Sequence, residues 1–580
     1  MQLFHHLAWF FKRYWHRYAI ALLMLAIVAV LNMIVPWMIG RSVDQLLDTR
    51  SLHDSTQYLI ALVGCAIAVY FLRFGWRRVL FGTSYNLGNI LRQHFYQRLT
   101  RQGQAFFNAH STGDLMARAT NDIDAVEMAA GEGILSGFDG LLTFILVIIM
   151  MFVFIDWRLA IFALLPFPIM GGAFYHLSHR IHGQFKDSLE KFSTLNEQVQ
   201  QAMTGMRMTK AMGREHIETL NFDQIAENAA ESNYRVARTE AKYEPVIGLS
   251  LGGALLITLL AGAWQIHAGQ LSIGKLTSFT MYLSELIWPM WAFGWLMNIV
   301  QRGNAAIERL EQLLTIKDSI DDFGTEELQA TSVSVRELTF FYPESSTPSL
   351  KHINFEFPAN TVLGIVGPTG AGKSTLIQLL MRYWQTKQGQ ICLGGKAIEQ
   401  YQLAQLRSAF AYVPQDPFLF STTIAENIRM GNPSATFEQV REAARVAAID
   451  DDIMNFPEGY DTLVGERGVT LSGGQRQRIS IARALISEAP MLILDDSLSA
   501  VDVHTEQKII SHLRSRTGQS VIIISHRLSA VEHAQQIMVL HHGEILELGS
   551  HAELLQQDRW YARMHNYQQL EKQIGERSHG

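Results

Sequence analysis

The sequence predicts two joined parts: an α-helical membrane domain of six transmembrane helices and an α/β domain with a largely parallel sheet. Two observations predict this fold class. Long apolar runs are confined to roughly the first half of the 580 residues. From about Ser332 onwards, short apolar runs alternate with helical stretches. We therefore expect a membrane domain at 1–310, a linker at 311–331 and the α/β domain at 332–580, whose polar end, Gln568–Gly580, is expected to be a frayed helix.

The composition excludes several other classes of protein. Charged residues make up 18% of the chain, below the roughly 25% of an ordinary soluble protein, which rules out disorder and coiled-coil rods. The net charge of −6 leaves no basic surplus, so we expect no nucleic-acid partner. The two cysteines, Cys65 and Cys392, fall in different predicted domains, so no disulfide framework is expected.

Six apolar runs are expected to cross a lipid bilayer as helices. A spanning helix needs about 20 apolar residues, with about 17–25 the usual range. The second run stops early, at Arg73, and reaches this length only if Phe74–Leu80 extends it. The alternative, buried core helices of a soluble protein, is disfavoured by so many runs in one half of the chain. The runs are Ala19–Ile39, Tyr58–Leu72, Ile134–Phe154, Leu159–Tyr175, Pro245–Ile266 and Leu276–Val300.

Charges beside these runs predict the orientation of the chain. Loops rich in Lys and Arg stay in the cytoplasm. The basic residues Lys12, Arg13 and Arg17 precede the first run, and Arg73, Arg77 and Arg78 follow the second. The loop between these two runs is acidic, so we place it outside. Six spans then leave both termini and the α/β domain in the cytoplasm, and we expect a multi-pass protein of a bacterial-type inner (cytoplasmic) membrane.

A phosphate-binding loop follows the predicted strand Val362–Val366. Residues 367–375 read GPTGAGKST and fit GxxxxGK[ST], in which backbone N–H groups and a helix N-terminus surround a polyphosphate. Lys373 is expected at the β- and γ-phosphates of ATP, and Ser374 at Mg²⁺. Asp495 ends the apolar strand Met491–Leu494 and is expected beside the same Mg²⁺. The predicted ATP-binding residues of this loop are Gly367, Pro368, Thr369, Gly370, Ala371, Gly372, Lys373, Ser374 and Thr375.

Residues 471–475 read LSGGQ and precede the helical stretch Arg476–Ser487, and this motif resembles the signature of ABC-transporter ATPases. Other motifs of that family follow in the family's order. They are an adenine-stacking aromatic at Tyr342, the Q-loop at Gln415, the exporter X-loop at Thr462–Gly468, the D-loop at Ser499, Ala500, Val501 and Asp502, and the switch histidine His526. With six spans ahead of one ATPase domain, the chain resembles a half-transporter of the exporter type, nearest in pattern to one subunit of bacterial heterodimeric multidrug exporters.

The resemblance implies a dimer that hydrolyses ATP. In the family, two ATPase domains pair head to tail, and each ATP lies between the P-loop of one chain and the signature of the other. Gln415 is implied as a ligand of Mg²⁺ and, with His526, as part of the catalytic set. Coupling helices that press on the ATPase domains are implied near Gln104–Ala109 and Ala211–Glu218. The signature residues that would act in trans are Leu471, Ser472, Gly473, Gly474 and Gln475.

One residue departs from the family pattern. The position after Asp495 is normally Glu, which polarises the attacking water, but here it is Asp496. The shorter side chain withdraws the carboxylate by about 1.5 Å, one C–C bond, and a misplacement of about 1 Å can lower a rate on the order of 100-fold. We therefore expect a partly degenerate ATP site and a different partner chain that carries Glu. The alternative is that Asp496 still acts, through a backbone shift or a second water.

The last apolar run carries the candidate substrate residues Glu285, Trp288 and Met281. A carboxylate within a span is costly and normally faces the helix bundle or a wet cavity, so an apolar, aromatic cavity with one acid would suit lipophilic cations. The alternative is that Glu285 pairs with a polar group on a neighbouring helix.

We therefore expect ATP-driven export of hydrophobic or amphipathic small molecules by alternating access, carried out by one half of a heterodimer. Two alternatives stay open: a homodimeric lipid flippase, and an ATP-gated membrane channel or regulator.

Overall fold

The computed structural model describes residues 2–49, 52–317, 320, 322–328, 330–343, 345–465, 471–515 and 518–578. Contacts within the chain divide it into two compact units. One comprises Met1–Arg98 and Gly113–Ile316, and the other comprises Leu99–Thr112 and Lys317–Gly580. We call them the membrane unit and the ATPase unit. The short segment Leu99–Thr112 thus belongs with the ATPase unit, although it precedes most of the membrane unit in the sequence.

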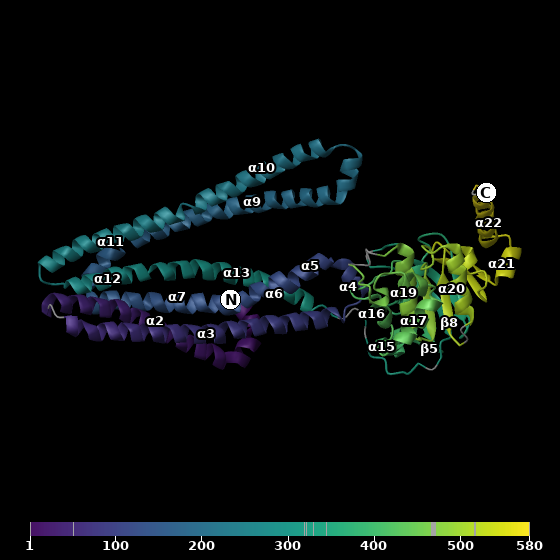
Figure 1. Ribbon diagram of the computed structural model, residues 1–580, viewed down its shortest axis with the longest axis horizontal. Helices are drawn as coiled ribbons and strands as arrows, with labels where there is room; N and C mark the ends of the chain where they lie inside the picture. The colour runs from purple at the N-terminus through teal and green to yellow at the C-terminus, as the bar shows by residue number, and fades with distance from the viewer. Residues whose placement is uncertain are drawn as a thin grey trace. The chain divides into compact units, whose positions relative to one another are not determined.

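The membrane unit consists of long helices (Figure 1). Among the described residues, five helical stretches are long and apolar enough to span a membrane: Ala8–Asp48, Thr56–Leu99, Thr112–Ile155, Trp157–Ala211 and Glu215–His267. The second predicted run therefore does extend past Arg73. The α-helices of the membrane unit are α1 (Gln2–His6), α2 (Ala8–Thr49), α3 (Leu52–Leu99), α5 (Thr112–Ala117), α6 (Ile123–Met128), α7 (Ile134–Ile149), α8 (Trp157–Leu164), α9 (Pro166–Ala211), α10 (Glu215–Glu240), α11 (Tyr243–His267), α12 (Ile273–Glu285) and α13 (Ile287–Leu314).

The sixth predicted span is divided between α12 and α13. The helix is interrupted at Leu286, whose N–H donates a hydrogen bond to the carbonyl of Leu283, three residues earlier. Pro289 explains the interruption, because a proline lacks an N–H and its ring clashes with the carbonyl four residues earlier. That carbonyl belongs to Glu285, the last residue of α12.

Small and polar residues join α12 to α2. The Asp44 carboxylate of α2 accepts from the Ser272 hydroxyl and from the Gly274 N–H, both at 2.7 Å, and so caps the start of α12. A Cβ on Gly274 would lie 1.9 Å from the carbonyl oxygen of Gly40, so only glycine permits this approach. These contacts fix the position of the helix that leads to α13.

The described residues of the ATPase unit form two sheets. A four-stranded antiparallel sheet has the order β2-β1-β4-β5, and a six-stranded sheet has the order β10-β9-β3-β8-β7-β6, in which only the β10–β9 pair is antiparallel. This confirms the predicted α/β domain. The strands are β1 (Val333–Phe340), β2 (Leu350–Phe357), β3 (Val362–Val366), β4 (Gln388–Leu393), β5 (Lys396–Ala397), β6 (Phe410–Val413), β7 (Met491–Asp495), β8 (Ser520–Ile524), β9 (Gln536–His541) and β10 (Glu544–Gly549).

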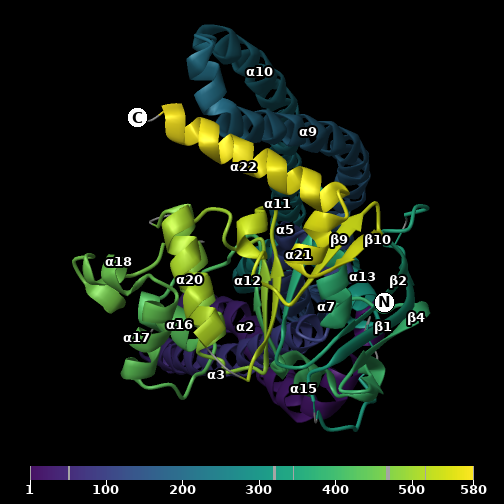
Figure 2. The same cartoon turned by 90° about the vertical axis from the view of Figure 1, so that its right-hand side faces the viewer.

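Apolar cores cover both faces of the parallel sheet. Successive side chains of a strand point to opposite faces, and in β7 Leu492 and Leu494 join one core while Met491 and Ile493 join the other. This explains why the strand is apolar throughout. Figure 2 shows α16 (Ile424–Arg429), α17 (Phe437–Val446), α18 (Asp450–Met454) and α20 (Val503–Ser515) on one side and the antiparallel sheet on the other.

A helix lies where the first coupling helix was expected, and it belongs to the ATPase unit. It is α4 (Gln104–Ala109), whose Phe106 is buried and whose Ala105 packs against the core beside the antiparallel sheet. The second expected coupling segment, Ala211–Glu218, is no separate helix: it comprises the last residue of α9, a turn at 212–214 and the first residues of α10. Gly213 ends α9 there in the left-handed conformation, at φ +61°.

Candidate nucleotide-binding site

The P-loop connects β3 to α14 (Lys373–Leu380) and is held by close backbone contacts. Gly367 and Gly372 have φ values of +148° and +98°, which disfavour other residues. A Cβ on Gly367 would lie 2.0 Å from the Leu540 carbonyl oxygen, and one on Gly372 would lie 2.7 Å from that of Ser349. These glycines are therefore required by the path of the loop between β9 and β2.

A cavity of about 630 Å³ lies beside this loop. Its lining brings together residues that are far apart in the sequence, from five of the predicted motifs. They are Tyr342, the P-loop residues Thr369, Gly370, Ala371, Gly372, Lys373, Ser374 and Thr375, then Gln415, Asp495, Asp496 and His526. Gly367 and Pro368 do not line the cavity; their carbonyls instead accept from the Lys373 ammonium, at 2.9 and 3.0 Å. Burial lowers the pKa of Lys373, while the charges on Asp496 and Asp495 oppose that shift.

Two of the predicted Mg²⁺ ligands, Ser374 and Asp495, are in direct contact where α14 meets β7. The Ser374 hydroxyl donates to Asp495 Oδ1 at 3.0 Å, and the Tyr412 hydroxyl donates to Asp495 Oδ2 at 3.2 Å. Burial raises the pKa of Asp495, whereas these hydrogen bonds oppose the rise. Hydroxyl, carboxylate and amide oxygens are ligands that Mg²⁺ accepts, so Ser374, Asp495 and Gln415 fit the ion chemically.

Asp496 is positioned by its backbone. Its φ is +48°, a left-handed conformation in which Asp is enriched among non-glycine residues. Its N–H donates to the Ile524 carbonyl at 2.9 Å, and its carbonyl accepts from the Ser499 hydroxyl at 2.8 Å. The Gln415 amide donates to Asp496 Oδ2 at 3.3 Å. The carboxylate that departs from the family pattern is therefore joined directly to the Q-loop.

Tyr342 lies at the edge of the cavity. Its hydroxyl shares a 2.9 Å hydrogen bond with the Thr375 hydroxyl, and its ring meets Trp384 edge to face, with centroids 5.1 Å apart. These contacts hold the ring beside the P-loop. Its stacking on adenine stays a prediction.

The signature forms the N-terminus of α19 (Gly473–Leu485). Ser472 caps this helix and Gln475 completes a capping box, so the N-terminal N–H groups are fixed. Ser472 and Gly473 are exposed. Of the described residues that line the cavity, none comes from Leu471–Gln475. The chain thus presents one P-loop cavity and, elsewhere on the same unit, one exposed signature.

The D-loop packs against this helix. A Cβ on Gly474 would lie 2.9 Å from the Ala500 carbonyl oxygen, and the Gln477 side-chain carbonyl accepts from the Ala500 N–H at 3.1 Å. These contacts join α19 directly to the D-loop.

Three residues that the sequence interpretation missed hold the switch segment in place. The Arg527 guanidinium donates to the carbonyls of Ser499 and Val501, both at 3.1 Å, and to Glu506 at 2.9 Å. On the other side, the Gln568 amide donates to the His526 carbonyl at 2.8 Å and accepts from the Leu528 N–H at 2.9 Å. Gln568 lies on α22 (Trp560–Ser578), so this helix is anchored at the point where a frayed tail was expected.

The structure describes only the first part of the expected X-loop. Thr462 and Leu463 of the expected X-loop are described, and Leu463 forms a bridge with Thr423. Glu466–Gly468 lie outside the described residues.

In the membrane unit, the three candidate substrate residues lie apart from a cavity that is lined by aromatic side chains. Glu285 and Trp288 are exposed, and the Trp288 indole donates to Asp139 at 2.8 Å. A cavity of about 850 Å³ lies between α9, α11 and α13, and neither these two residues nor Met281 lines it. Their role in binding substrate stays a prediction. Side chains that do line this cavity include Phe174, Tyr243, Trp291, Trp295, Glu240 and Glu244.

Comparisons with known proteins agree with this geometry over nearly the whole chain. The family described as "ABC transporter transmembrane region" matches residues 18–290, and "ABC transporter" matches residues 350–499. The chain is 44% identical to the multidrug resistance-like ATP-binding protein MdlA of Escherichia coli K12, over 98% of this chain and 97% of that protein. It is 38% identical to YheI of Bacillus subtilis, a probable multidrug resistance ABC transporter ATP-binding/permease protein, over 97% of each chain.

More distant relatives extend the comparison. The chain is 31% identical to an ATP-dependent lipid A-core flippase of Vibrio cholerae, over 96% of this chain and 97% of that one. The solved structure of a bacterial Atm1-family ABC exporter with ATP bound is similar at a TM-score of 0.79 and 25% identity, over 95% of this chain and 99% of that one. The predicted fold class and family are thereby confirmed. The chain belongs to the ABC transporter family, as an exporter subunit with its membrane region and its ATPase domain in one polypeptide.

Proposed function

We propose that this chain is one half of a heterodimeric exporter of hydrophobic or amphipathic small molecules, driven by Mg·ATP in the bacterial inner membrane with its ATPase unit in the cytoplasm. The observation that carries the proposal is the separation of the P-loop cavity from the exposed signature. One chain holds half of two nucleotide sites, so a second chain completes both.

Five residues of the cavity have a chemical task in this proposal. Lys373 neutralises the β- and γ-phosphates, while Ser374, Asp495 and Gln415 hold Mg²⁺, which supplies charge neutralisation at the phosphates. Asp496 orients the attacking water, with its carboxylate held by Gln415. The exposed N-terminus of α19 offers N–H groups and a positive helix end to the γ-phosphate held by the partner.

Asp496 favours a partner of different sequence. The short carboxylate weakens the site built on this chain's own P-loop, whereas the complete LSGGQ motif supports a competent site on a partner that carries Glu. Purification of the chain alone and together with such a partner tests this asymmetry. We expect the pair to hydrolyse ATP much faster than the single chain. Full ATPase activity of the chain by itself would overturn the heterodimer.

The cavity between α9, α11 and α13 supports a lipophilic cation as substrate. Aromatic rings offer apolar area and cation–π contacts, and Glu240 and Glu244 add negative charge at its border. The proposal is tested by ATP-dependent uptake of a fluorescent lipophilic cation into inverted vesicles that contain the pair. We expect the double variant Glu240→Gln/Glu244→Gln to lose cation uptake and to keep uptake of a neutral dye. Glu227→Gln, at an exposed position of α10 outside the cavity lining, is the matched control.

A lipid flippase is the second candidate, because one relative over nearly the full chain is named an ATP-dependent lipid A-core flippase. In that case the chain alone would form an active homodimer that moves a fluorescent lipid between the leaflets of a proteoliposome. An ATP-gated channel would instead give an ion current without uphill transport of dye.

A further inference from the structure

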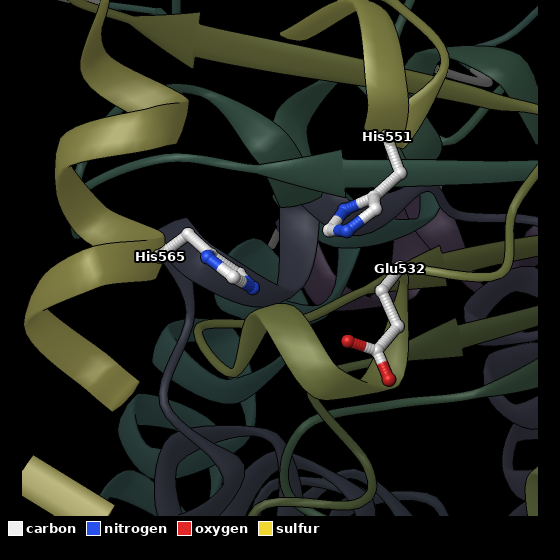
Figure 3. Close-up of side chains that lie close together, drawn as sticks. All are labelled: Glu532, His551 and His565. Carbon is white, nitrogen blue, oxygen red and sulfur yellow. The ribbon is translucent and has the colours of Figure 1, made fainter. Parts of the chain in front are cut away.

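Three potential metal ligands meet at the C-terminal end of the ATPase unit (Figure 3). Glu532 lies in the turn after the short helix η7 (Leu528–Ala530), His551 is the first residue of α21 (His551–Gln556), and His565 lies on α22. One nitrogen of each histidine and one carboxylate oxygen all lie within 4.8 Å of one another. All three side chains are half-buried, and Figure 3 shows the two rings turned toward each other above the carboxylate.

We infer that Glu532, His551 and His565 form a binding site for Zn²⁺ or a similar transition-metal ion, and that the bound ion fastens the C-terminal helix α22 to the segment carrying the switch histidine. Two imidazoles and a carboxylate form a ligand set typical of zinc, with a fourth position left for water. Mg²⁺ prefers oxygen ligands, so this donor set is distinct from the predicted Mg²⁺ set at Ser374 and Asp495.

The geometry requires only a small adjustment. Zinc bonds of about 2.0–2.2 Å place two tetrahedral ligands about 3.4 Å apart. The two rings have centroids 5.3 Å apart, so they can converge without moving the helices. Because the three side chains are only half-buried, rotation about their side-chain bonds brings the ligand atoms together.

A buried tyrosine orients one of the ligands. The Nδ1 atom of His551 lies 2.8 Å from the hydroxyl of Tyr561, which is fully buried. Ligating histidines almost always use their second ring nitrogen in such a hydrogen bond, which directs the other nitrogen to the metal. The contact leaves Nε2 of His551 to face the cluster.

The position of the cluster connects it to the catalytic machinery. His565 lies three residues before Gln568 on α22, and residues three apart share a helix face. Gln568 holds the His526 carbonyl and the Leu528 N–H. A metal ion would therefore join α22 to the turn that follows the switch histidine at a second point, beside the hydrogen bonds of Gln568, and so restrict the movement of both segments. This inference does not depend on the transported substrate or on the partner chain.

The test is metal binding by the full-length chain, purified with a tag free of histidine, stripped with a chelator and kept without nucleotide. Titration calorimetry with Zn²⁺ gives the affinity, and Co²⁺ reports nitrogen and oxygen coordination through its visible absorption bands. We expect one tight site. His565→Ala and Glu532→Gln should each weaken binding at least about tenfold. Asn566→Ala is the matched control, because this exposed neighbour of His565 on α22 belongs to no ligand set.

Equal Zn²⁺ affinity in the wild type and in both ligand variants would overturn the site, as would sulfur-to-cobalt bands, which would assign the metal to Cys65 or Cys392. Hydrogen exchange tests the second part of the inference. Zn²⁺ should slow amide exchange in 526–533 and 560–570 of the wild type and leave His565→Ala unchanged. Tight binding without that protection would overturn the proposed restraint on the switch segment.

Discussion

Replacing Asp496 by Glu tests the degenerate site most directly. The Asp496 carboxylate is held by the Gln415 amide at 3.3 Å, and its backbone is fixed by bonds to Ile524 and Ser499. The main chain is therefore unable to advance the carboxylate, and the missing C–C bond of about 1.5 Å stays uncompensated. A misplacement of about 1 Å can cost on the order of 100-fold in rate. We thus expect Asp496→Glu to raise hydrolysis at this site by about 10- to 100-fold.

The activity of the other nucleotide site decides how much Asp496→Glu changes the total rate of ATP hydrolysis. Where the other site is fully active and this site is about 100-fold slower, restoring this site raises the total rate of hydrolysis by at most about twofold. When the partner's Glu is first replaced by Gln, the same substitution acts on a silent background and should restore most of the activity. The assay is phosphate release by the purified pair under saturating Mg·ATP, with Asp496→Asn as the control that removes the charge. An unchanged rate in both backgrounds would refute the reasoning and favour an Asp496 that acts through a second water.

Three further substitutions have expected outcomes. Glu506 is 1% exposed and pairs with Arg527, which is 41% exposed. Because the arginine left behind is solvated, Glu506→Gln should lower the free energy of unfolding by about 1.5 kcal/mol, the lower end for a hydrogen bond to a charged group, as measured by chemical denaturation of the full chain. Gly474→Ala should slow ATP hydrolysis at the partner's P-loop more than at its own, because its Cβ would lie 2.9 Å from a D-loop carbonyl; this is measured in pairs with one silenced site. Burial tends to raise the pKa of Asp450, but hydrogen bonds from Tyr460 and an arginine outweigh it, so the net pKa lies below its ordinary value of 3.8. The Asp450 carboxylate therefore stabilises the fold above that ordinary value, and the deficit of Asp450→Asn in denaturation should be constant from about pH 7 to 5 and shrink below about pH 4.

The sequence was sufficient for the features that depend on local pattern. The P-loop spacing, the apolar strand before Asp495 and the long apolar runs each follow from residues that are close together in the chain. The break at Leu286 could also be read from Pro289, four residues after Glu285, although the run was expected to be continuous.

Contacts between segments that are distant in the chain could not be predicted from the local sequence pattern. Gln568 follows His526 by 42 positions in a polar stretch, and nothing in its neighbours marks it as a contact of the switch segment. His551 and His565 lie 14 positions apart, far from the compact spacing of a metal motif, and only the packing of α21 beside α22 brings them to Glu532. The aromatic cavity of about 850 Å³ likewise exists only because α9, α11 and α13 pack around it.

The hydrogen bonds of the ATPase unit connect its two half-sites in one sequence of contacts. An ATP held by a partner would touch the exposed start of α19, whose Gln477 binds the Ala500 N–H of the D-loop. The carbonyls of Ser499 and Val501 are held in turn by Arg527, the residue after the switch histidine. We therefore expect a shift of α19 to reach the residue next to His526 through hydrogen bonds of about 3 Å at each step. Gln568 of α22 also holds this segment, through the His526 carbonyl and the Leu528 N–H. We therefore expect these bonds to oppose any movement of His526 that a shift of α19 causes.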